Sequence, residues 1–114
     1  MHKIAVMACC LFFVLQAHAE FWGETDIPLM DDMVVNESES FSFDAPAGQI
    51  VGFSAKVSKP IQEVQDFYDT TLMELGWQKK SRAVYTREQD ELTLTMDRIN
   101  GGTIVRIQYA FPNR

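Results

Sequence analysis

Residues 61–77 read IQEVQDFYDTTLMELGW, and this stretch decides the architecture. Its apolar side chains recur at intervals of three and four, which is the spacing that gives an α-helix one apolar face. Glutamine and acidic residues fill the positions between them and form the solvent-facing side. The pattern therefore predicts one amphipathic helix over residues 60–75, whose apolar face consists of Ile61, Val64, Phe67, Tyr68, Thr71, Leu72 and Leu75.

Both ends of this helix carry recognisable signals. Pro60 suits the first turn, where its missing N–H costs nothing, and either Ser58 or Lys59 is expected to be the cap. Gly76 suits the left-handed residue that follows a helix, and Trp77 can then fold back onto the last turns.

Alternating apolar and polar residues predict strands on both sides of the helix. Two strands, at residues 41–44 and 49–57, precede it and are joined by a turn at residues 45–48. Three more strands follow, at residues 83–87, 91–99 and 103–111, and Asn100-Gly101-Gly102 is a strong hairpin signal. The predicted order is β-β-α-β-β-β. This order predicts an α+β fold, a two-layer sandwich in which one helix packs on one face of an antiparallel sheet of about five strands.

Residues 1–19 have the three parts of a cleavable secretory signal. Lys3 supplies a positive charge, residues 4–15 are apolar and uncharged, and Ala17-His18-Ala19 places small residues at the cleavage point. The apolar run is shorter than the roughly 20 residues of a membrane span. A retained anchor, or lipidation at Cys9, is the less favoured alternative. We predict a signal peptide over residues 1–19, an acidic N-terminal arm over residues 20–40 and a single α/β domain over residues 41–114.

Export of this kind predicts cleavage after Ala19, a periplasmic or secreted location, and no membrane insertion after cleavage. It also removes both cysteines and both histidines of the chain. A Cys nucleophile, a Ser-His-Asp triad and a histidine base are then excluded, and zinc, haem or iron–sulfur ligation is disfavoured. We expect no cofactor, no metal and no catalytic residue, and hence no enzyme.

Charge is distributed unevenly along the chain. Residues 20–44 hold half of the 16 acidic residues and no lysine or arginine. Such a stretch repels phosphate backbones, so nucleic acid is not an expected partner. The sequence does not determine the oligomeric state.

The acidic arm also contains apolar side chains that a solvated linker would lack. The simpler interpretation is that the arm packs across its own domain. The alternative is that it docks on a partner, most plausibly another envelope protein, through Phe21, Trp22, Leu29, Met30 and Met33. A basic group, formed by Lys79, Lys80, Arg82 and Arg87, suits either an anionic ligand or this acidic arm.

Three weaker patterns are interpreted as surface features. The acidic pairs of the arm do not have the spacing of a calcium-binding EF-hand loop. Glu88, Asp90 and Glu91 cluster in a predicted turn, where polar residues are ordinary. Ser54 and Lys56 share a strand face, but a serine–lysine nucleophile needs more than this proximity.

Two motifs carry a resemblance. Residues 43–50 read FDAPAGQI and residues 67–77 read FYDTTLMELGW, and Tyr85-Thr86-Arg87-Glu88 leads into an apolar strand. Together they resemble a family of small exported proteins of Gram-negative bacteria that has no assigned activity. The family's turn reads FDxPxGRI, so this chain departs from it at Gln49, where arginine is expected. The resemblance implies the predicted fold and an envelope location, and the residues that carry it are Pro46, Gly48, Phe67, Tyr68, Leu72, Gly76 and Trp77.

These observations favour a non-catalytic protein-binding module of the bacterial envelope. It would act through the arm or through an exposed strand edge that accepts an added strand. The alternative is a small acidic inhibitor of an envelope enzyme, steered by charge. A carboxylate-dependent hydrolase comes third.

Overall fold

The computed structural model describes residues 20–23 and 25–113. The predicted signal peptide lies outside these residues. The described elements, in chain order, are β1 (Glu20–Phe21), β2 (Pro28–Leu29), β3 (Val34–Ala45), β4 (Gly48–Val57), α2 (Ile61–Glu74), β5 (Gln78–Lys79), β6 (Val84–Arg87), β7 (Asp90–Ile99) and β8 (Gly102–Pro112).

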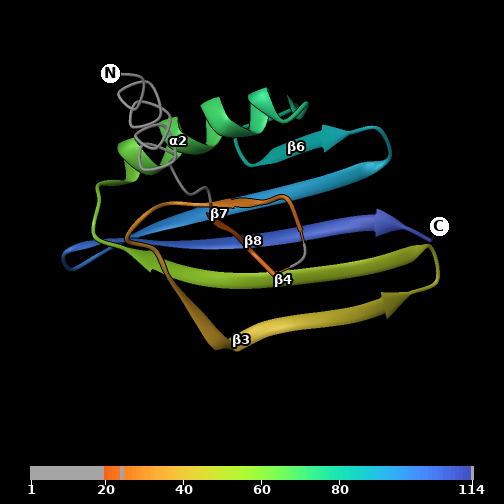
Figure 1. The fold of residues 1–114 in the computed structure, drawn as a ribbon, viewed down its shortest axis with the longest axis horizontal. Helices are drawn as coiled ribbons and strands as arrows, with labels where there is room; N and C mark the ends of the chain where they lie inside the picture. Colours follow the sequence, from red (N-terminus) through yellow and green to blue (C-terminus); the bar gives the residue numbers. More distant parts are fainter. Residues whose placement is uncertain (1–19, 24, 114) are drawn as a thin grey trace, which may run out of the picture.

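Six strands form one antiparallel sheet in the order β3-β4-β8-β7-β6-β5, and β1 and β2 pair separately (Figure 1). The centre of the sheet is the long pairing of β4 with β8, which runs from Gly48 opposite Pro112 to Val57 opposite Thr103. This pairing joins the segment before the helix to the last strand of the chain. It leaves β3 and β5 as the two edges.

The predicted α+β class is confirmed, with six strands in the main sheet where about five were expected. The additional strand is β5, which consists of two exposed residues and therefore has no alternating pattern to reveal it. The strand predicted at residues 41–44 is the end of the much longer β3, which begins at Val34. The boundary predicted between arm and domain, at residue 40, falls inside this strand.

The helix ends as its sequence indicates. Gly76 has a φ of 96°, in the left-handed region. The Trp77 N–H donates to the Leu72 carbonyl at 2.9 Å and the Gly76 N–H donates to the Met73 carbonyl at 3.1 Å. These two bonds make a Schellman motif, which delivers Trp77 into the core, where it is 2% exposed.

The beginning of the helix differs from the prediction. The N-cap is Pro60, whose backbone is extended, and no side chain caps the helix. Ser58 and Lys59 were therefore wrong as cap residues. The Lys59 carbonyl instead accepts a hydrogen bond from the Thr103 hydroxyl at 2.8 Å, which ties the approach to the helix to β8.

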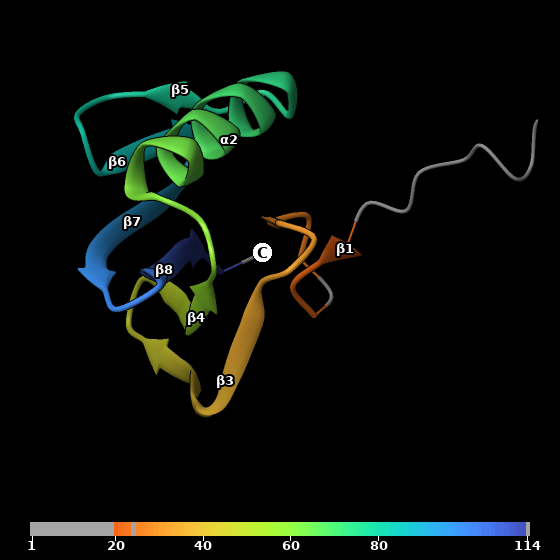
Figure 2. The same cartoon turned by 90° about the vertical axis from the view of Figure 1, so that its left-hand side faces the viewer.

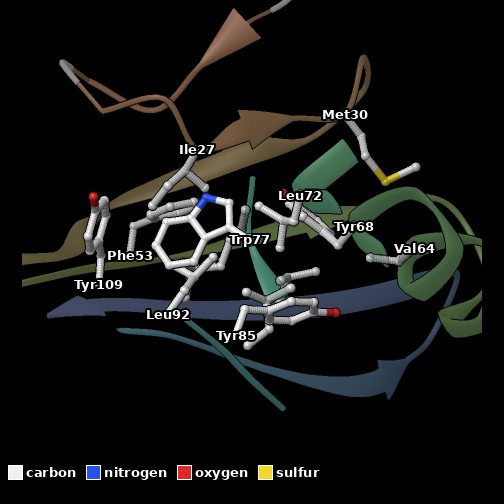
Figure 3. Packing of buried hydrophobic residues seen from close by; sticks show 14 of the residues in the cluster. Ile27, Met30, Phe53, Val64, Tyr68, Leu72, Trp77, Tyr85, Leu92 and Tyr109 are labelled. Carbon is white, nitrogen blue, oxygen red and sulfur yellow. The ribbon is translucent and has the colours of Figure 1, made fainter. Parts of the chain in front are cut away.

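The core lies between the sheet and two covering segments. Six strands spaced about 4.8 Å apart span roughly 24 Å, whereas a helix is only about 10–12 Å wide. The helix α2 contacts β5, β7 and β8, and residues 20–23 and 25–33 lie on the same side of the sheet as this helix (Figure 2). We call residues 20–33, apart from Glu24, the cover segment. Its Ile27 is fully buried and belongs to the same core cluster as Leu72, Trp77 and Leu92 (Figure 3). No helix in the described part of the chain is long and apolar enough to cross a membrane.

Candidate binding surface at the edge of the sheet

The residues predicted to contact a partner are mostly used by the chain itself. Met30 is 6% exposed and belongs to the core. Trp22, Leu29 and Met33 are partly buried against that core, and the Trp22 ring lies 4.4 Å from the Phe53 ring, between centroids. Phe21 alone of the five is an exposed large hydrophobic residue. The described residues at positions 20–33 therefore pack on their own domain, as the simpler interpretation of the arm predicted, and Phe21 is the one of the five that is exposed.

An ion pair fastens the cover segment to β6. The Arg87 guanidinium donates to both carboxylate oxygens of Asp26, at 2.8 and 3.1 Å, and also to the Leu75 carbonyl at 3.0 Å. The hydrogen bond from Arg87 lowers the pKa of Asp26 despite the opposing effect of burial. The guanidinium also lies 4.4 Å from the centre of the Trp77 ring, a cation–π arrangement. The predicted pairing of the basic group with the acidic arm is thus present at Arg87.

Two further contacts hold the cover segment in place. The fully buried Tyr68 donates its hydroxyl hydrogen to the Pro28 carbonyl at 2.8 Å. Burial raises the pKa of Tyr68, so this hydroxyl stays protonated and keeps its donor hydrogen at any ordinary pH. At the end of the segment, Lys59 pairs with Asp32 at 3.3 Å. The conspicuous tyrosine of the helix motif thus serves to bind the cover segment.

The edge at β5 is short and attached to the helix. Lys79 Nζ lies 2.9 Å from Asp69 Oδ1, and the Tyr85 hydroxyl donates to the same oxygen at 2.5 Å. Burial tends to raise the pKa of Asp69, but the hydrogen bonds from Tyr85, Lys79 and Gln65 outweigh it and lower the pKa. With only two paired residues and the helix beside it, this edge offers little to another strand.

The edge at β3 is of a different kind. It is 12 residues long, and every one of its residues is at least partly exposed. It pairs with β4 on one side only, so alternate residues direct their N–H and C=O groups away from the sheet. Three of the large hydrophobic residues that the described part of the chain exposes lie on this strand: Val34 (68% exposed), Phe41 (46%) and Phe43 (57%).

The side chains of β3 are sorted between two faces. Phe41 lies opposite Gly52, and a Cβ at Gly52 would come within 2.5 Å of the Phe41 ring. Glycine at position 52 therefore leaves room for this ring on the face of the sheet away from the helix. Ser42 lies opposite Val51, whose face also carries Phe53 and Ala55, so Ser40 and Ser42 face the covered side.

The strand is interrupted and acidic. Its register with β4 shifts between Asn36 and Phe41, which leaves a bulge. In the bulge, Glu39 accepts a hydrogen bond from the buried Ser54 hydroxyl. β3 carries Glu37, Glu39 and Asp44 and no basic residue. Antiparallel pairing with a second copy would oppose like charges, which is destabilising. Bulges and charges of this kind protect an edge against self-association.

The residues of the weaker patterns have different surroundings in the structure. Glu88 and Glu91 are exposed, whereas Asp90 is 8% exposed and accepts a hydrogen bond from the Tyr109 hydroxyl at 2.7 Å. Burial and this hydrogen bond raise the pKa of Tyr109. Ser54 donates to Glu39, not to Lys56. Within residues 20–23 and 25–113, no group of three or more acidic side chains converges as metal ligands would.

Comparisons with protein-family models, curated proteins and solved structures found no match to this chain. The resemblance to small exported proteins remains a prediction.

The β3 edge was only partly predicted from the sequence. The alternation of Phe41 and Phe43 with serines indicated a strand, but no local pattern showed that this strand would be an edge.

Proposed function

We propose that this chain is a non-catalytic protein-binding module of the bacterial envelope, which accepts an extended, basic segment of another polypeptide as an added strand at β3. The observation that carries the proposal is the contrast between the two edges, since β3 is long and exposed whereas β5 is two residues long and held by the helix. Main-chain hydrogen bonds would supply affinity, and side chains would supply selectivity.

The charge of β3 supports a basic partner. Glu37, Glu39 and Asp44 stand on one strand without a basic residue, so lysine or arginine on an incoming strand would be attracted and a second copy of this chain would be repelled. Opposite charge also accelerates encounter. The same chemistry would serve a small acidic inhibitor of a basic enzyme, which is a special case of this binding mode.

A peptide titration tests the proposal. The full chain is expressed and the protein is purified from the envelope fraction, where its mass also reports whether cleavage follows Ala19. The probe is a short peptide that alternates lysine with valine or threonine, and the readout is amide hydrogen exchange resolved by NMR. We expect new protection at residues 41–45, with no change in β5. Protection in β5 alone, or none anywhere, would contradict the proposal.

Two control peptides and two variants sharpen the result. A peptide with glutamate in place of every lysine should not bind. The lysine peptide with methylated backbone nitrogens should not bind either, because it has lost the N–H groups that would pair with β3. Glu37→Lys should weaken binding of the lysine peptide about two- to fivefold, the effect of one exposed charge. Glu74→Lys, an equal charge change at the exposed end of α2, should leave it unchanged.

A further inference from the structure

The strand β6 lies beside only the first part of its neighbour β7 (Figure 1). It pairs with residues 90–93 of β7, and the Leu94 N–H adds one bond, to the Ala83 carbonyl at 2.8 Å. β7 itself continues to Ile99. Residues 95–99 therefore pair with β8 on one side, and no other described strand lies beside them on the other.

The main-chain groups of this free stretch of β7 have a defined direction. Successive residues of an antiparallel strand direct their N–H and C=O groups to alternate sides. Because the Leu94 N–H points to the side of β6, Met96 and Arg98 direct their main-chain groups to that side as well. The stretch is therefore a short edge that a further strand can join, in line with β6.

A hollow of about 540 Å³ lies between this edge and the first turns of α2. The apolar side chains in its lining are Ile61, Ala83, Leu94 and Met96. Lys79 and Arg82 also line it, and none of the lining residues is acidic. In a chain with a formal net charge of −6, such a lining is a local preference for an anion.

The basic residues at this edge differ in what they already bind. Lys79 is paired with Asp69 at 2.9 Å. Arg82 and Arg98 are exposed, and neither guanidinium makes an ion pair within residues 20–23 and 25–113. Arg82 lies where β6 stops and Arg98 lies near the far end of β7, so one cation is available at each end of the free edge.

We propose that this hollow captures the free carboxyl terminus of another polypeptide, whose last residues add to β7 as an antiparallel strand. A strand that is antiparallel to β7 runs in the same direction as β6, so its C-terminus stops at Arg82 and Ala83, just before β6 begins. Its carboxylate then meets the Arg82 guanidinium. A parallel strand would place an ammonium group there and be repelled. This site is separate from β3 and goes beyond the proposed function.

The register determines the side chains that the occupant needs. Residues directly opposite each other in an antiparallel pair point to the same face of the sheet. A last residue opposite Met96 therefore directs its side chain into the hollow, whose apolar lining favours leucine, isoleucine or valine. The residue two positions earlier lies opposite Arg98, which favours glutamate or aspartate. The occupant thus ends in an acidic residue, any strand-forming residue and an aliphatic residue with a free carboxylate.

The test uses the protein purified from the envelope fraction and an N-acetylated peptide that ends in Glu-Thr-Leu with a free carboxylate. Amide hydrogen exchange resolved by NMR should show new protection at Met96 and Arg98 and no change at residues 41–45. NMR titration gives the affinity. The same peptide with a C-terminal amide should bind about five- to tenfold more weakly, because it lacks the charge that pairs with Arg82.

Arg82→Gln separates carboxylate capture from pairing with β7. The variant should fold as well as the parent, because the side chain that it changes is exposed and makes no ion pair. It should bind the acid and the amide peptide with equal affinity. Lys56→Gln makes an equal charge change at an exposed position of β4 and should preserve the preference for the acid.

The outcomes separate this proposal from the one for β3. If the acid and the amide bind the parent equally, or if the preference survives in Arg82→Gln, capture of the carboxylate by Arg82 is refuted. If Met96 and Arg98 gain no protection, the site itself is refuted. Neither result bears on the β3 proposal, because the lysine peptide that tests it protects a different strand.

Discussion

The cover segment and β3 are consecutive acidic stretches of the chain, yet the cover segment packs into the core whereas β3 stays at the surface. Both combine apolar and acidic residues, and neither has a lysine or arginine. In the cover segment, Ile27 is fully buried and Met30 is 6% exposed, whereas in β3 Val34 is 68% and Phe43 57% exposed. Similar composition therefore did not decide which stretch would be core and which would be surface.

The difference follows from what each stretch meets. The cover segment lies over the part of the sheet that α2 is too narrow to reach, and its Asp26 and Asp32 find Arg87 and Lys59. β3 extends the sheet by one strand and has no further strand beside it. Its Asp44 and Glu39 pair with the neutral side chains of Gln49 and Ser54. An acidic segment therefore packs onto the sheet where basic side chains lie next to apolar surface that the helix leaves uncovered.

The largest effect is expected from a substitution that loosens the cover segment and so makes it resemble β3. Ile27→Ala should lower the free energy of unfolding by about 2–4 kcal/mol, because it removes buried methyl and methylene groups and leaves a cavity in the core. Urea denaturation followed by circular dichroism measures it. Phe21→Ala, in the same segment but exposed, should cost less than about 0.5 kcal/mol. Equal small losses would show that the cover segment is not part of the core.

A smaller effect concerns the ion pair that fastens the segment. Asp26→Asn should lower the free energy of unfolding by about 1 kcal/mol near neutral pH, a value that allows for the partial exposure of the carboxylate. Asp31→Asn changes the charge equally at an exposed site and should have little effect.

The pH dependence of this loss has a definite sign. The pKa of Asp26 is lowered in the folded protein, so the carboxylate contributes stability above its unfolded pKa of about 3.9. That contribution disappears as pH falls from about 4 through the lowered folded value. Parent and Asp26→Asn should therefore converge in acid. A gap that persists well below pH 3 would mean that the ion pair is not its source.

The smallest effect sharpens the description of β3 as surface. Phe43→Thr should change the free energy of unfolding by less than about 0.5 kcal/mol, because its ring is already largely in water and threonine suits a strand. Phe53→Thr, in the neighbouring strand but 2% exposed, should cost several times more. A large loss at Phe43 would show that its face of the sheet is covered in solution.

The sequence by itself determined the parts whose signals are local. The spacing of Val64, Tyr68 and Leu72 predicted the helix, Gly76 predicted its end, and the alternation around Phe53 and Val105 predicted the strands with their inward faces. Each of these depends on neighbours within a turn of helix or along one strand, so periodicity is sufficient to reveal it.

Only the tertiary structure decided that the acidic cover segment packs into the core and that the acidic strand β3 is an exposed edge. Asp26 and Pro28 find their partners, Arg87 and Tyr68, 61 and 40 residues further along the chain. Among the described strands, β3 is an edge because it has a neighbour on one side only. The two residues of β5 pair with β6, and the residue before the N-cap Pro60 is bonded through its carbonyl to Thr103 of β8. Contacts between distant segments depend on strand order and on which surface the helix leaves uncovered, and neither is encoded in a local pattern.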